Sequence, residues 1–271
     1  MERERDYVLG THEQEVERLG LQHRVWRPHV LSCWHRTGIT VGKRILDVGA
    51  GPGYATLDLA EIVGPTGEVV AVERSHNFIQ ALQERVTRRG LTNVKAHEID
   101  LMVDPLPAGR YDFSWCRWVA AFVSDPGLLI QKLSRVLPSG AVSIFHEYSQ
   151  YDTWRYYPSL PHHGPFRDLV VQTWRESGGE PDAGPVVIAL LRKNGFRIRS
   201  VQPLIFCVRP TEYMWQWAAE FVDNYLPRLQ DAGRIDQAFV DKLREELARA
   251  EADADSTMIT PLVLEIIAEK L

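Results

Sequence analysis

The stretch ILDVGAGPG, residues 45–53, constrains the fold more than any other feature of the chain. It begins in a short aliphatic run, 44–48, and ends where a helical pattern starts, at 54–63. Its glycines let the backbone turn sharply after a strand and approach a ligand closely. The free N–H groups at the start of the next helix attract an anionic group. The segment therefore predicts a strand–loop–helix unit that binds a small anionic molecule.

An acidic residue follows this loop at the end of the second predicted strand. Glu73 lies about 20 residues beyond the loop, where a carboxylate of the neighbouring strand accepts hydrogen bonds from both hydroxyls of a ribose. A dinucleotide site requires Gly-x-Gly-x-x-Gly, but here Gly53 comes one residue early and Tyr54 occupies the third glycine position. The spacing favours an adenosine ligand without a pyrophosphate. The simpler alternative is a tight strand-to-helix turn with no ligand.

Short β-branched runs alternate with helical stretches through the first half of the chain. Helical periodicity covers 78–86 and 129–137, and each of these helices has one apolar face. Strands that alternate with helices form a parallel sheet with helices on both faces. The predicted strands are 44–48, 68–72, 94–99, 111–116 and 141–145.

The segments on either side of this core are less regular. Pro28 interrupts the apolar positions between 12 and 36, which predicts two short helices. Residues 148–185 are rich in Tyr, Trp, Pro, His and Gly and are predicted as a long ordered loop with one helix near 166–175. Further on we expect a helix at 184–193, a sixth strand at 196–208, helices within 211–253 and a seventh strand at 258–268.

The predicted architecture is a single α/β domain over residues 1–271, with a seven-stranded, mostly parallel sheet and helices on both faces. Residues 1–40 are expected to form an N-terminal helical flap, 41–147 the ligand-binding core, and 148–185 and 211–253 helical lid insertions over the substrate. With 271 residues, 45% of them hydrophobic, the chain is long enough to bury the core of such a domain.

Charge and cysteine content limit the partners and the compartment. A formal net charge of -5 and a pI near 6.0 argue against a protein that binds nucleic acid through a basic face. The three cysteines lie far apart without metal or disulfide spacing, which indicates a reducing, cytoplasmic setting. No apolar run has the length of a membrane span, and the N-terminus has no signal-peptide core. We expect a cytoplasmic protein that acts on a small molecule.

The sequence resembles the class I S-adenosylmethionine-dependent methyltransferases, in particular the bacterial small-molecule and quinone-type enzymes. Asp47–Gly53 is similar to the family's first motif, Glu73 to its ribose-binding acid, and 111–118 to its fourth-strand motif. The likeness extends roughly over 7–137 and the final strand. It implies S-adenosylmethionine as the cofactor and S-adenosylhomocysteine as the product.

The same resemblance assigns the residues that contact the cofactor. Asp100 is expected to accept a hydrogen bond from the exocyclic amine of adenine, and the end of the fourth strand is expected to face the methyl donor. For Arg18, a solvated charge on a helix is preferred over a cofactor contact. Pro138 and Ser139 depart from the family's usual Lys-Pro-Gly-Gly turn. The full set is Tyr7, Gln22, Asp47, Gly49, Gly51, Gly53, Glu73, Arg74, Asp100, Leu101 and Arg117.

The chemistry of methyl transfer asks little of reactive side chains. Transfer from a sulfonium is an in-line displacement, which depends on alignment and on exclusion of water. If the acceptor must lose a proton, His146 is the candidate general base, with Tyr148 beside it. The alternative for His146 is a packed, hydrogen-bonded histidine. The sequence shows no cluster of residues at metal-ligand spacing, so we expect no catalytic metal.

The two insertions carry many aromatic residues with two possible roles. They form either the wall of a pocket for a flat acceptor or the core of the lid itself. The residues are Tyr148, Tyr151, Trp154, Tyr156, Tyr157, Phe166, Trp174, Trp215 and Trp217.

Three functions remain open. The leading hypothesis is methylation of a small-molecule acceptor, such as an aromatic compound or a natural product. The second is a methyltransferase for RNA or protein, with a basic patch from Arg192, Lys193, Arg197 and Arg199 on its surface. The end of the fourth strand lacks the Asn-Pro-Pro-Tyr type motif of enzymes that methylate an exocyclic amine. This further disfavours a nucleic acid as the acceptor. The third is a catalytically degenerate protein that binds S-adenosylmethionine.

Overall fold

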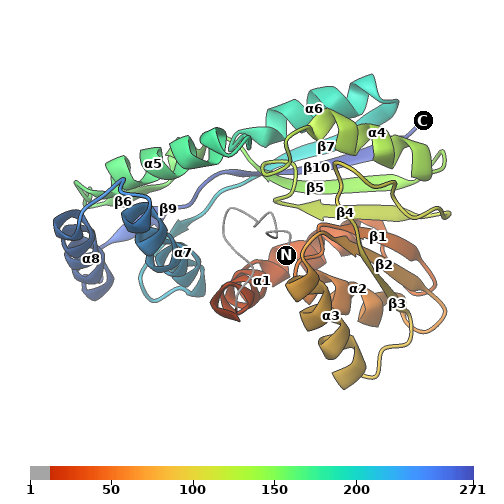
Figure 1. Ribbon diagram of the computed structural model, residues 1–271, viewed down its shortest axis with the longest axis horizontal. Coiled ribbons are helices and arrows are strands. Elements are labelled where there is room, and N and C mark those ends of the chain that lie inside the picture. Colours follow the sequence, from red (N-terminus) through yellow and green to blue (C-terminus); the bar gives the residue numbers. More distant parts are fainter. Residues whose placement is uncertain (1–12) are drawn as a thin grey trace.

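A seven-stranded sheet forms the centre of the protein (Figure 1). The computed structural model describes residues 13–271, so the predicted cofactor contact Tyr7 lies outside the described residues. All seven strands run parallel except β10, which is antiparallel to both of its neighbours. This confirms the predicted α/β class with a mostly parallel sheet. The strands, in order across the sheet, are β3 (Val94–Glu98), β2 (Glu68–Glu73), β1 (Arg44–Val48), β4 (Phe113–Arg117), β5 (Val142–Tyr148), β10 (Val263–Lys270) and β7 (Phe196–Leu204).

Helices cover both faces of this sheet (Figure 1). One face carries α1 (Glu13–Thr37), α2 (Tyr54–Val63) and α3 (His76–Arg88), and the other carries α4 (Pro126–Val136) and α6 (Ala183–Lys193). The strand order reverses between β1 and β4, so the crossover helices on the two sides of this point lie on opposite faces. Such a reversal opens a crevice at the carboxyl ends of β1 and β4, where open α/β sheets bind ligands.

Side-chain caps fix the starts of two helices near this crevice. The Ser75 hydroxyl accepts a hydrogen bond from the Phe78 N–H at 3.3 Å and caps α3. The Asp125 carboxylate accepts from the Leu128 N–H at 3.0 Å and caps α4, whose first residue is Pro126. Both arrangements satisfy N–H groups that a helix start leaves free. They explain why these helices begin immediately after the loops that line the crevice.

The N-terminal segment forms one helix rather than the two that Pro28 predicted. α1 continues through Pro28, which lies inside the helix. A proline removes one helical hydrogen bond. Trp26, Val30 and Trp34 are buried on one side of α1, and their packing against the sheet and α7 (Tyr213–Asp231) keeps the helix continuous.

The predicted sixth and seventh strands are each divided between two sheets. The segment 196–208 forms β7 and then β8 (Cys207–Val208), and 258–268 lies in β9 (Thr257–Ile259) and then β10. β6 (Arg155–Tyr157), β9 and β8 form a separate three-stranded sheet. The two segments pass from one sheet to the other side by side. Thr260 donates its N–H to the Phe206 carbonyl at 3.0 Å, and its hydroxyl accepts from the Phe206 N–H at 3.1 Å. These bonds replace ladder pairing at the bend.

The small sheet joins three helices to form the lid, at the left of Figure 1. We use the word lid for β6, β8, β9, α5 (His163–Glu176), α7 and α8 (Gln237–Ala252). The helix predicted near 166–175 is confirmed as α5, but the prediction of a loop over the rest of 148–185 was incomplete, because β6 and the start of α6 also lie there. The predicted helices within 211–253 are confirmed as α7 and α8.

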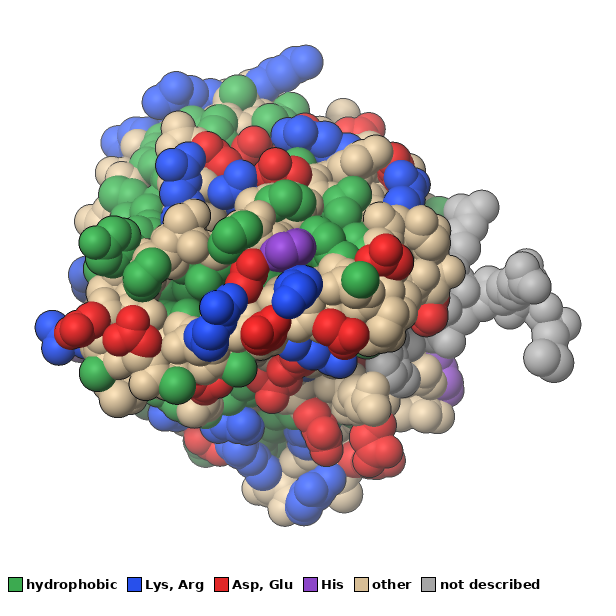
Figure 2. Space-filling model, turned by 90° about the vertical axis from the view of Figure 1, so that its left-hand side faces the viewer, with side chains coloured by type: hydrophobic (Ala, Val, Ile, Leu, Met, Phe, Trp, Pro, Cys, Tyr) green, Lys and Arg blue, Asp and Glu red, His purple; other side chains and the backbone are tan. Residues whose placement is uncertain are grey.

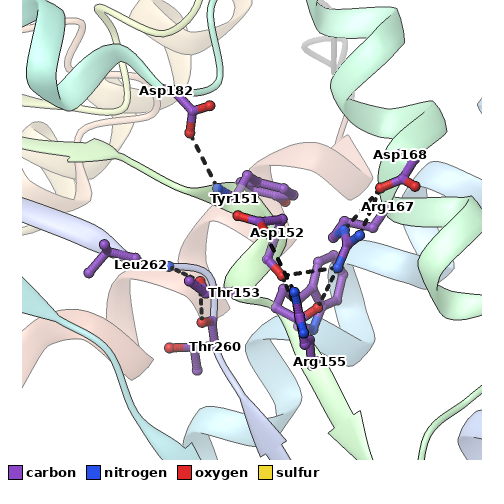
Figure 3. A network of polar contacts seen from close by, with 10 residues as sticks. Tyr151, Asp152, Thr153, Arg155, Arg167, Asp168, Asp182, Thr260 and Leu262 are labelled. Atoms are coloured by element: carbon purple, nitrogen blue, oxygen red, sulfur yellow. Dashed lines mark hydrogen bonds and ion pairs between the residues drawn. The ribbon is translucent and has the colours of Figure 1, made fainter.

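A turn at Tyr151–Thr153 attaches the lid to the central sheet (Figure 3). The Thr153 hydroxyl donates to the Thr260 carbonyl at 3.2 Å and accepts from the Leu262 N–H at 2.9 Å. From the other side, Arg167 of α5 donates to the Asp152 carbonyl at 3.0 Å. Since one turn bonds both to α5 and to the β9–β10 connection, the lid is held at a fixed position against the sheet.

None of the helices within residues 13–271 is long and apolar enough to cross a membrane.

Candidate functional site

One cavity of about 590 Å³ opens at the carboxyl ends of the central strands. It lies at the reversal of strand order, between α1, the glycine-rich loop and the loop that follows β4. Its size is in the range of small-ligand sites. Of the predicted cofactor residues, it is lined by Gln22, Asp47, Gly49, Gly51, Glu73, Arg74, Asp100, Leu101 and Arg117.

The three glycines of the loop differ in what they make possible. All three have a positive φ, which favours glycine. A Cβ on Gly53 would lie 2.6 Å from Leu82 of α3, so this residue permits close packing of α2 and α3 and does not line the cavity. A Cβ on Gly51 would meet nothing within 4 Å. Gly51 therefore leaves open space beside the cavity, as close approach of a ligand requires.

Glu73 ends β2 with its carboxylate fixed by backbone groups. One oxygen accepts from the Gly51 N–H at 2.9 Å, and the other accepts from the N–H groups of Arg74 and Ser75 at 2.8 and 2.9 Å. Burial raises the pKa of Glu73, and these three hydrogen bonds oppose the rise. The carboxylate is thus preorganised next to the glycine-rich loop, with lone pairs left to accept further hydrogen bonds.

Asp47 is the buried acid of the glycine-rich motif. Its carboxylate accepts from the Thr56 hydroxyl at 2.6 Å. Burial raises its pKa to about 6, against the lowering effects of Thr56 and of the nearby Arg117. The pair of Asp47 and Arg117 therefore places an acceptor and a cation on the same wall of the cavity.

The loop after β3 forms the opposite end of the cavity. One oxygen of Asp100 accepts from the Met102 N–H at 2.8 Å, which fixes the carboxylate. Phe78, Leu101 and Met102 give this end apolar walls. Flat apolar surface beside a fixed carboxylate suits an aromatic ring with an amino group.

Arg117 and Trp118 form the β4 side of the cavity. The Arg117 guanidinium lies 5.0 Å from the centroid of the Trp118 ring, and its Nη1 has no hydrogen-bond partner among the described residues. Trp118 has a φ of 53°, which is strained for a non-glycine residue. Its ring stacks between Tyr148 at 5.4 Å and Trp217 of the lid at 5.9 Å. Packing from both sides therefore holds this strained residue at the cavity wall.

Sequence reasoning missed the residue that shapes the loop after Trp118. The Glu147 carboxylate is fully buried and accepts from the N–H groups of Val119 and Ala120 at 2.9 Å and of Ala121 at 3.3 Å. Burial raises its pKa to about 7. Because Val119 lines the cavity, Glu147 sets the shape of that wall from behind. In the sequence, only the position of Glu147 directly after His146 pointed to this role.

The structure places the candidate base His146 away from the cavity. Its ring is fully buried, 4.8 Å from the Trp115 ring, and its Nε2 lies 3.3 Å from the Glu265 carboxylate. Neither His146 nor Tyr148 lines the cavity. Burial lowers the pKa of His146, and Glu265 opposes this. These contacts favour the alternative that His146 is a packed, hydrogen-bonded histidine.

Arg18 is buried rather than solvated. Its guanidinium donates to Glu15 at 2.7 and 2.8 Å and to the Gln22 side-chain oxygen at 3.1 Å. The interpretation as a solvated helix charge was therefore wrong. A charge paired within the first turns of α1 tolerates burial because both partners are satisfied.

The predicted aromatic set packs mainly as the core of the lid. Trp154, Phe166, Trp174 and Trp215 are buried in one hydrophobic cluster with α1, while Tyr157 is exposed. None of the nine residues lines the cavity. The aromatic residues that do line it are Tyr54 of α2, Phe78 of α3, and Trp115, Trp118 and Phe122 from β4 and the loop after it. These contacts favour the second of the two roles, in which the nine aromatic residues form the core of the lid rather than the wall of the acceptor pocket.

One group of described residues brings possible metal ligands together. The ligand atoms of Cys33, His146 and Glu265 lie within 4.8 Å of one another, all buried. The Glu265 carboxylate also pairs with Arg36 at 2.5 Å. This group lies beneath α1, and none of its residues lines the cavity.

Comparison with known proteins agrees with this geometry. A family model for a methyltransferase domain matches residues 39–173. The demethylmenaquinone methyltransferase of Geobacillus stearothermophilus is 32% identical over 129 residues, which are 48% of this chain and 54% of that enzyme. The enzyme of the same name from Staphylococcus aureus (strain Newman) is 31% identical over 140 residues, 52% of this chain and 53% of the enzyme. The chain spans about half the length of the curated relatives it matches.

Two solved structures share the fold. Geranyl diphosphate C-methyltransferase from Streptomyces coelicolor A3(2) has a TM-score of 0.58 at 15% identity, covering 96% of this chain and 86% of that one. Coclaurine N-methyltransferase has a TM-score of 0.58 at 14% identity, covering 90% and 72%. A reversed parallel sheet with a glycine-rich loop and a following acid at one cavity defines a class of nucleotide-binding α/β proteins. Within it, the chain belongs to the class I S-adenosylmethionine-dependent methyltransferases.

Proposed function

We propose that the protein transfers a methyl group from S-adenosylmethionine to a small-molecule acceptor. The observation that carries this proposal is that Gly51, Glu73 and Asp100, at the carboxyl ends of β1, β2 and β3, converge on one cavity. When bound, the cofactor supplies an electrophilic methyl group on a sulfonium.

The adenosine part fits the end of the cavity formed by β2 and β3. The Glu73 carboxylate, held in place by three backbone N–H groups, has lone pairs for the two ribose hydroxyls. The second oxygen of Asp100 is available for the exocyclic amine of adenine, and Leu101 and Met102 pack against the ring. Preorganised acceptors of this kind bind without a further entropic cost of ordering.

The methionine part fits the end formed by α1 and β4. The Gln22 side-chain oxygen accepts from Arg18 and from the Trp217 indole N–H, both at 3.1 Å, so its amide N–H groups are left to donate into the cavity. Arg117 also lines the cavity, and its buried Nη1 has no partner among the described residues, so this guanidinium is the second donor. Two donors suit a carboxylate, and the Asp47 carboxylate suits the ammonium group.

This chain contributes alignment and exclusion of water to the transfer. Trp118, fixed between Tyr148 and Trp217, places a rigid apolar ring next to Arg117 on the β4 side of the cavity and helps to exclude water there. We assign no general base, because His146 and Tyr148 do not line the cavity. We propose that residues 1–40 act as a flap, 41–147 as the cofactor-binding core, and 148–185 and 211–253 as the insertions that determine the substrate. We also propose that the enzyme acts in the cytoplasm.

The identity of the acceptor depends on parts of the chain that the family model does not cover. The match ends at residue 173, before α6, α7 and α8. The relatives' name makes demethylmenaquinone the first acceptor to test. Because Trp217 of the lid stacks on Trp118, we propose that the lid selects the acceptor.

A macromolecular acceptor has less support. Figure 2 shows acidic and basic side chains interspersed over the side of the lid, without a basic face. Of the basic residues considered above, Arg197 and Arg199 both pair with Glu269. Neutralised surface arginines contribute little to binding a polyanion.

Titration calorimetry with S-adenosylmethionine and S-adenosylhomocysteine tests the proposal, with NAD as the control ligand. We expect micromolar binding of both sulfur nucleosides and no heat with NAD. Glu73→Ala should weaken binding more than about tenfold, since two charge-assisted hydrogen bonds to the ribose are lost. Glu98→Ala, an exposed carboxylate at the end of β3, is the matched control. Binding of NAD alone, or normal binding by Gly51→Arg, would overturn the proposal.

A further inference from the structure

His23 is a buried residue of α1 that connects two charged groups across the protein. Its Nδ1 lies 3.2 Å from Nη2 of Arg117 on β4, and its Nε2 lies 3.0 Å from the Asp58 carboxylate on α2. The residue is 4% exposed. Nothing in the sequence pattern indicated this connection, because His23 and Arg117 are separated by 94 residues.

The partners fix the protonation and the tautomer of His23. A guanidinium only donates hydrogen bonds, so Nδ1 must accept from Arg117 and carry no proton. Nε2 then carries the single proton and donates it to Asp58. The Asp58 carboxylate also accepts from Arg27 at 2.7 Å. Although burial acts to raise the pKa of Asp58, the hydrogen bonds from His23 and Arg27 hold it below its usual value.

This chain of hydrogen bonds fixes the guanidinium of Arg117 at the cavity. Arg117 is held by His23 at one nitrogen and by the face of Trp118, while Nη1 has no partner. Burial lowers the pKa of Arg117 to about 10, so it remains a cation at neutral pH. Arg117 lines the cavity and its Nη1 is buried without a partner among the described residues, so an anionic oxygen that reached this nitrogen would satisfy it.

We propose that His23, oriented by Asp58, is a positioning residue that aims Arg117 at a carboxylate, and that this carboxylate belongs to the methionine part of the cofactor. The inference rests on the proposed function. The anionic oxygen could also come from the acceptor, and the ligands chosen for the test distinguish these two sources.

The test compares two nucleosides that differ in the carboxylate. S-adenosylhomocysteine carries the amino-acid group, whereas 5′-methylthioadenosine keeps the adenosine and the sulfur but lacks it. In the wild type we expect the first to bind more tightly. His23→Phe keeps an aromatic ring beside Tyr54 but can bond to neither Arg117 nor Asp58. It should weaken S-adenosylhomocysteine about tenfold and leave 5′-methylthioadenosine unchanged.

Two further variants separate positioning from structural support. His23→Gln retains an acceptor and a donor on one group, so it should restore most of the selectivity between the two nucleosides. His35→Gln, on the exposed side of α1, should behave as the wild type. A merely structural role of His23 would lower the affinity for both nucleosides, or the melting temperature, without changing their ratio.

Acidification provides a second readout. Burial lowers the pKa of His23, and Asp58 opposes the shift. The groups that face His23 are Arg117 from β4, Asp58 and Tyr54 from α2, and Arg27 from α1 through Asp58. Protonation would remove the acceptor for Arg117 and place two cations together, so selectivity should fall as the pH decreases below 6.5. In His23→Gln this fall should be smaller than in the wild type.

The outcomes are distinguishable from failure of the proposed function. If the wild type binds neither nucleoside, the proposed function and this inference both fail. If it binds both equally, the carboxylate site is wrong while a nucleoside site remains. If His23→Phe binds both nucleosides as the wild type does but methylates its acceptor more slowly, the anionic oxygen belongs to the acceptor, and our assignment to the cofactor is overturned.

Discussion

Trp217 of α7 donates its indole N–H to the side-chain oxygen of Gln22, 195 residues earlier in the chain, at 3.1 Å. The bond joins the lid to the wall of the cavity, because Gln22 lines it. Together with Arg18, Trp217 determines which end of the Gln22 amide faces the cavity. The position of the lid and the chemistry of the cofactor site are therefore coupled through one amide group.

Replacing Trp217 by Phe should weaken cofactor binding without displacing the lid. Phenylalanine can keep the stacking on Trp118 but has no N–H, so Gln22 would lose one of the two donors that orient it. Loss of one neutral hydrogen bond predicts a rise in the Kd for S-adenosylhomocysteine of about three- to tenfold in calorimetry. Trp215→Phe, in the same helix but packed on Tyr156, is the control. An unchanged Kd for Trp217→Phe would contradict the coupling.

Local features of the sequence could be predicted, and long-range ones could not. The glycine-rich loop and Glu73 act within a strand–loop–helix unit and the strand beside it, so spacing along the chain locates them. The bonds between Trp217 and Gln22 and between His23 and Asp58 join different elements through side chains. Periodicity reports which face of a helix is buried but not which partner meets it.

The error at His146 has a particular physical cause. Successive side chains of a strand point to opposite faces of the sheet, so a shift of one position changes the environment completely. The sequence placed 146–148 at the correct end of β5 but not on a face. In the structure, His146 points beneath α1, whereas Glu147 points to the loop after β4 and supports the cavity.

Substitution of Glu147 by Gln should disturb the loop after β4. The amide has one acceptor oxygen in place of two, and its NH₂ group would face a backbone N–H that now has no acceptor. An unsatisfied buried group costs about 1–3 kcal/mol, so the free energy of unfolding in urea should fall by about that amount. The affinity for S-adenosylhomocysteine should fall as well, because Val119 and Trp118 line the cavity. Glu98→Gln, exposed on β3, should change neither quantity.

Acid should destabilise the protein partly through His163 in the lid. This histidine is 3% exposed, packs against the rings of Trp154 and Tyr156, and its Nε2 has no partner among the described residues. Burial, followed by the charge of Arg167, lowers its pKa to about 3. Its folded pKa is below the unfolded value near 6.5, so stability is complete above pH 6.5 and falls as the pH decreases toward about 3.

The corresponding measurement is the free energy of unfolding as a function of pH. His163 should contribute a slope of at most roughly 1.4 kcal/mol per pH unit within this window. His163→Phe fills the same space between the two rings without a titrating group, so its stability should decline less steeply. If the variant and the wild type lose stability in parallel between pH 6.5 and 4, His163 is not the responsible group.

The buried group of Cys33, His146 and Glu265 should bind no metal in the wild type, despite its donor atoms. Arg36 already occupies one oxygen of Glu265, and a guanidinium beside the site repels a divalent cation. Although burial opposes it, hydrogen bonds from His146 and Cys33, together with Arg36, hold the pKa of Glu265 at about 2. Burial also raises the pKa of the Cys33 thiol, whereas a metal requires the thiolate.

Elemental analysis of the purified protein tests this balance. We expect zinc well below one equivalent, and no change in S-adenosylhomocysteine affinity after treatment with a chelator. The matched variant is Arg36→Met, which keeps an aliphatic side chain but frees the Glu265 oxygen. If the guanidinium excludes the cation, Arg36→Met should bind zinc more tightly than the wild type does. A contrary result would be one equivalent of zinc in the wild type that is lost, together with folding stability, on chelation. The thiol, the imidazole and the carboxylate would then form a structural metal site. Arg36 would have to move aside into the solvent, to which 44% of its side chain is already exposed.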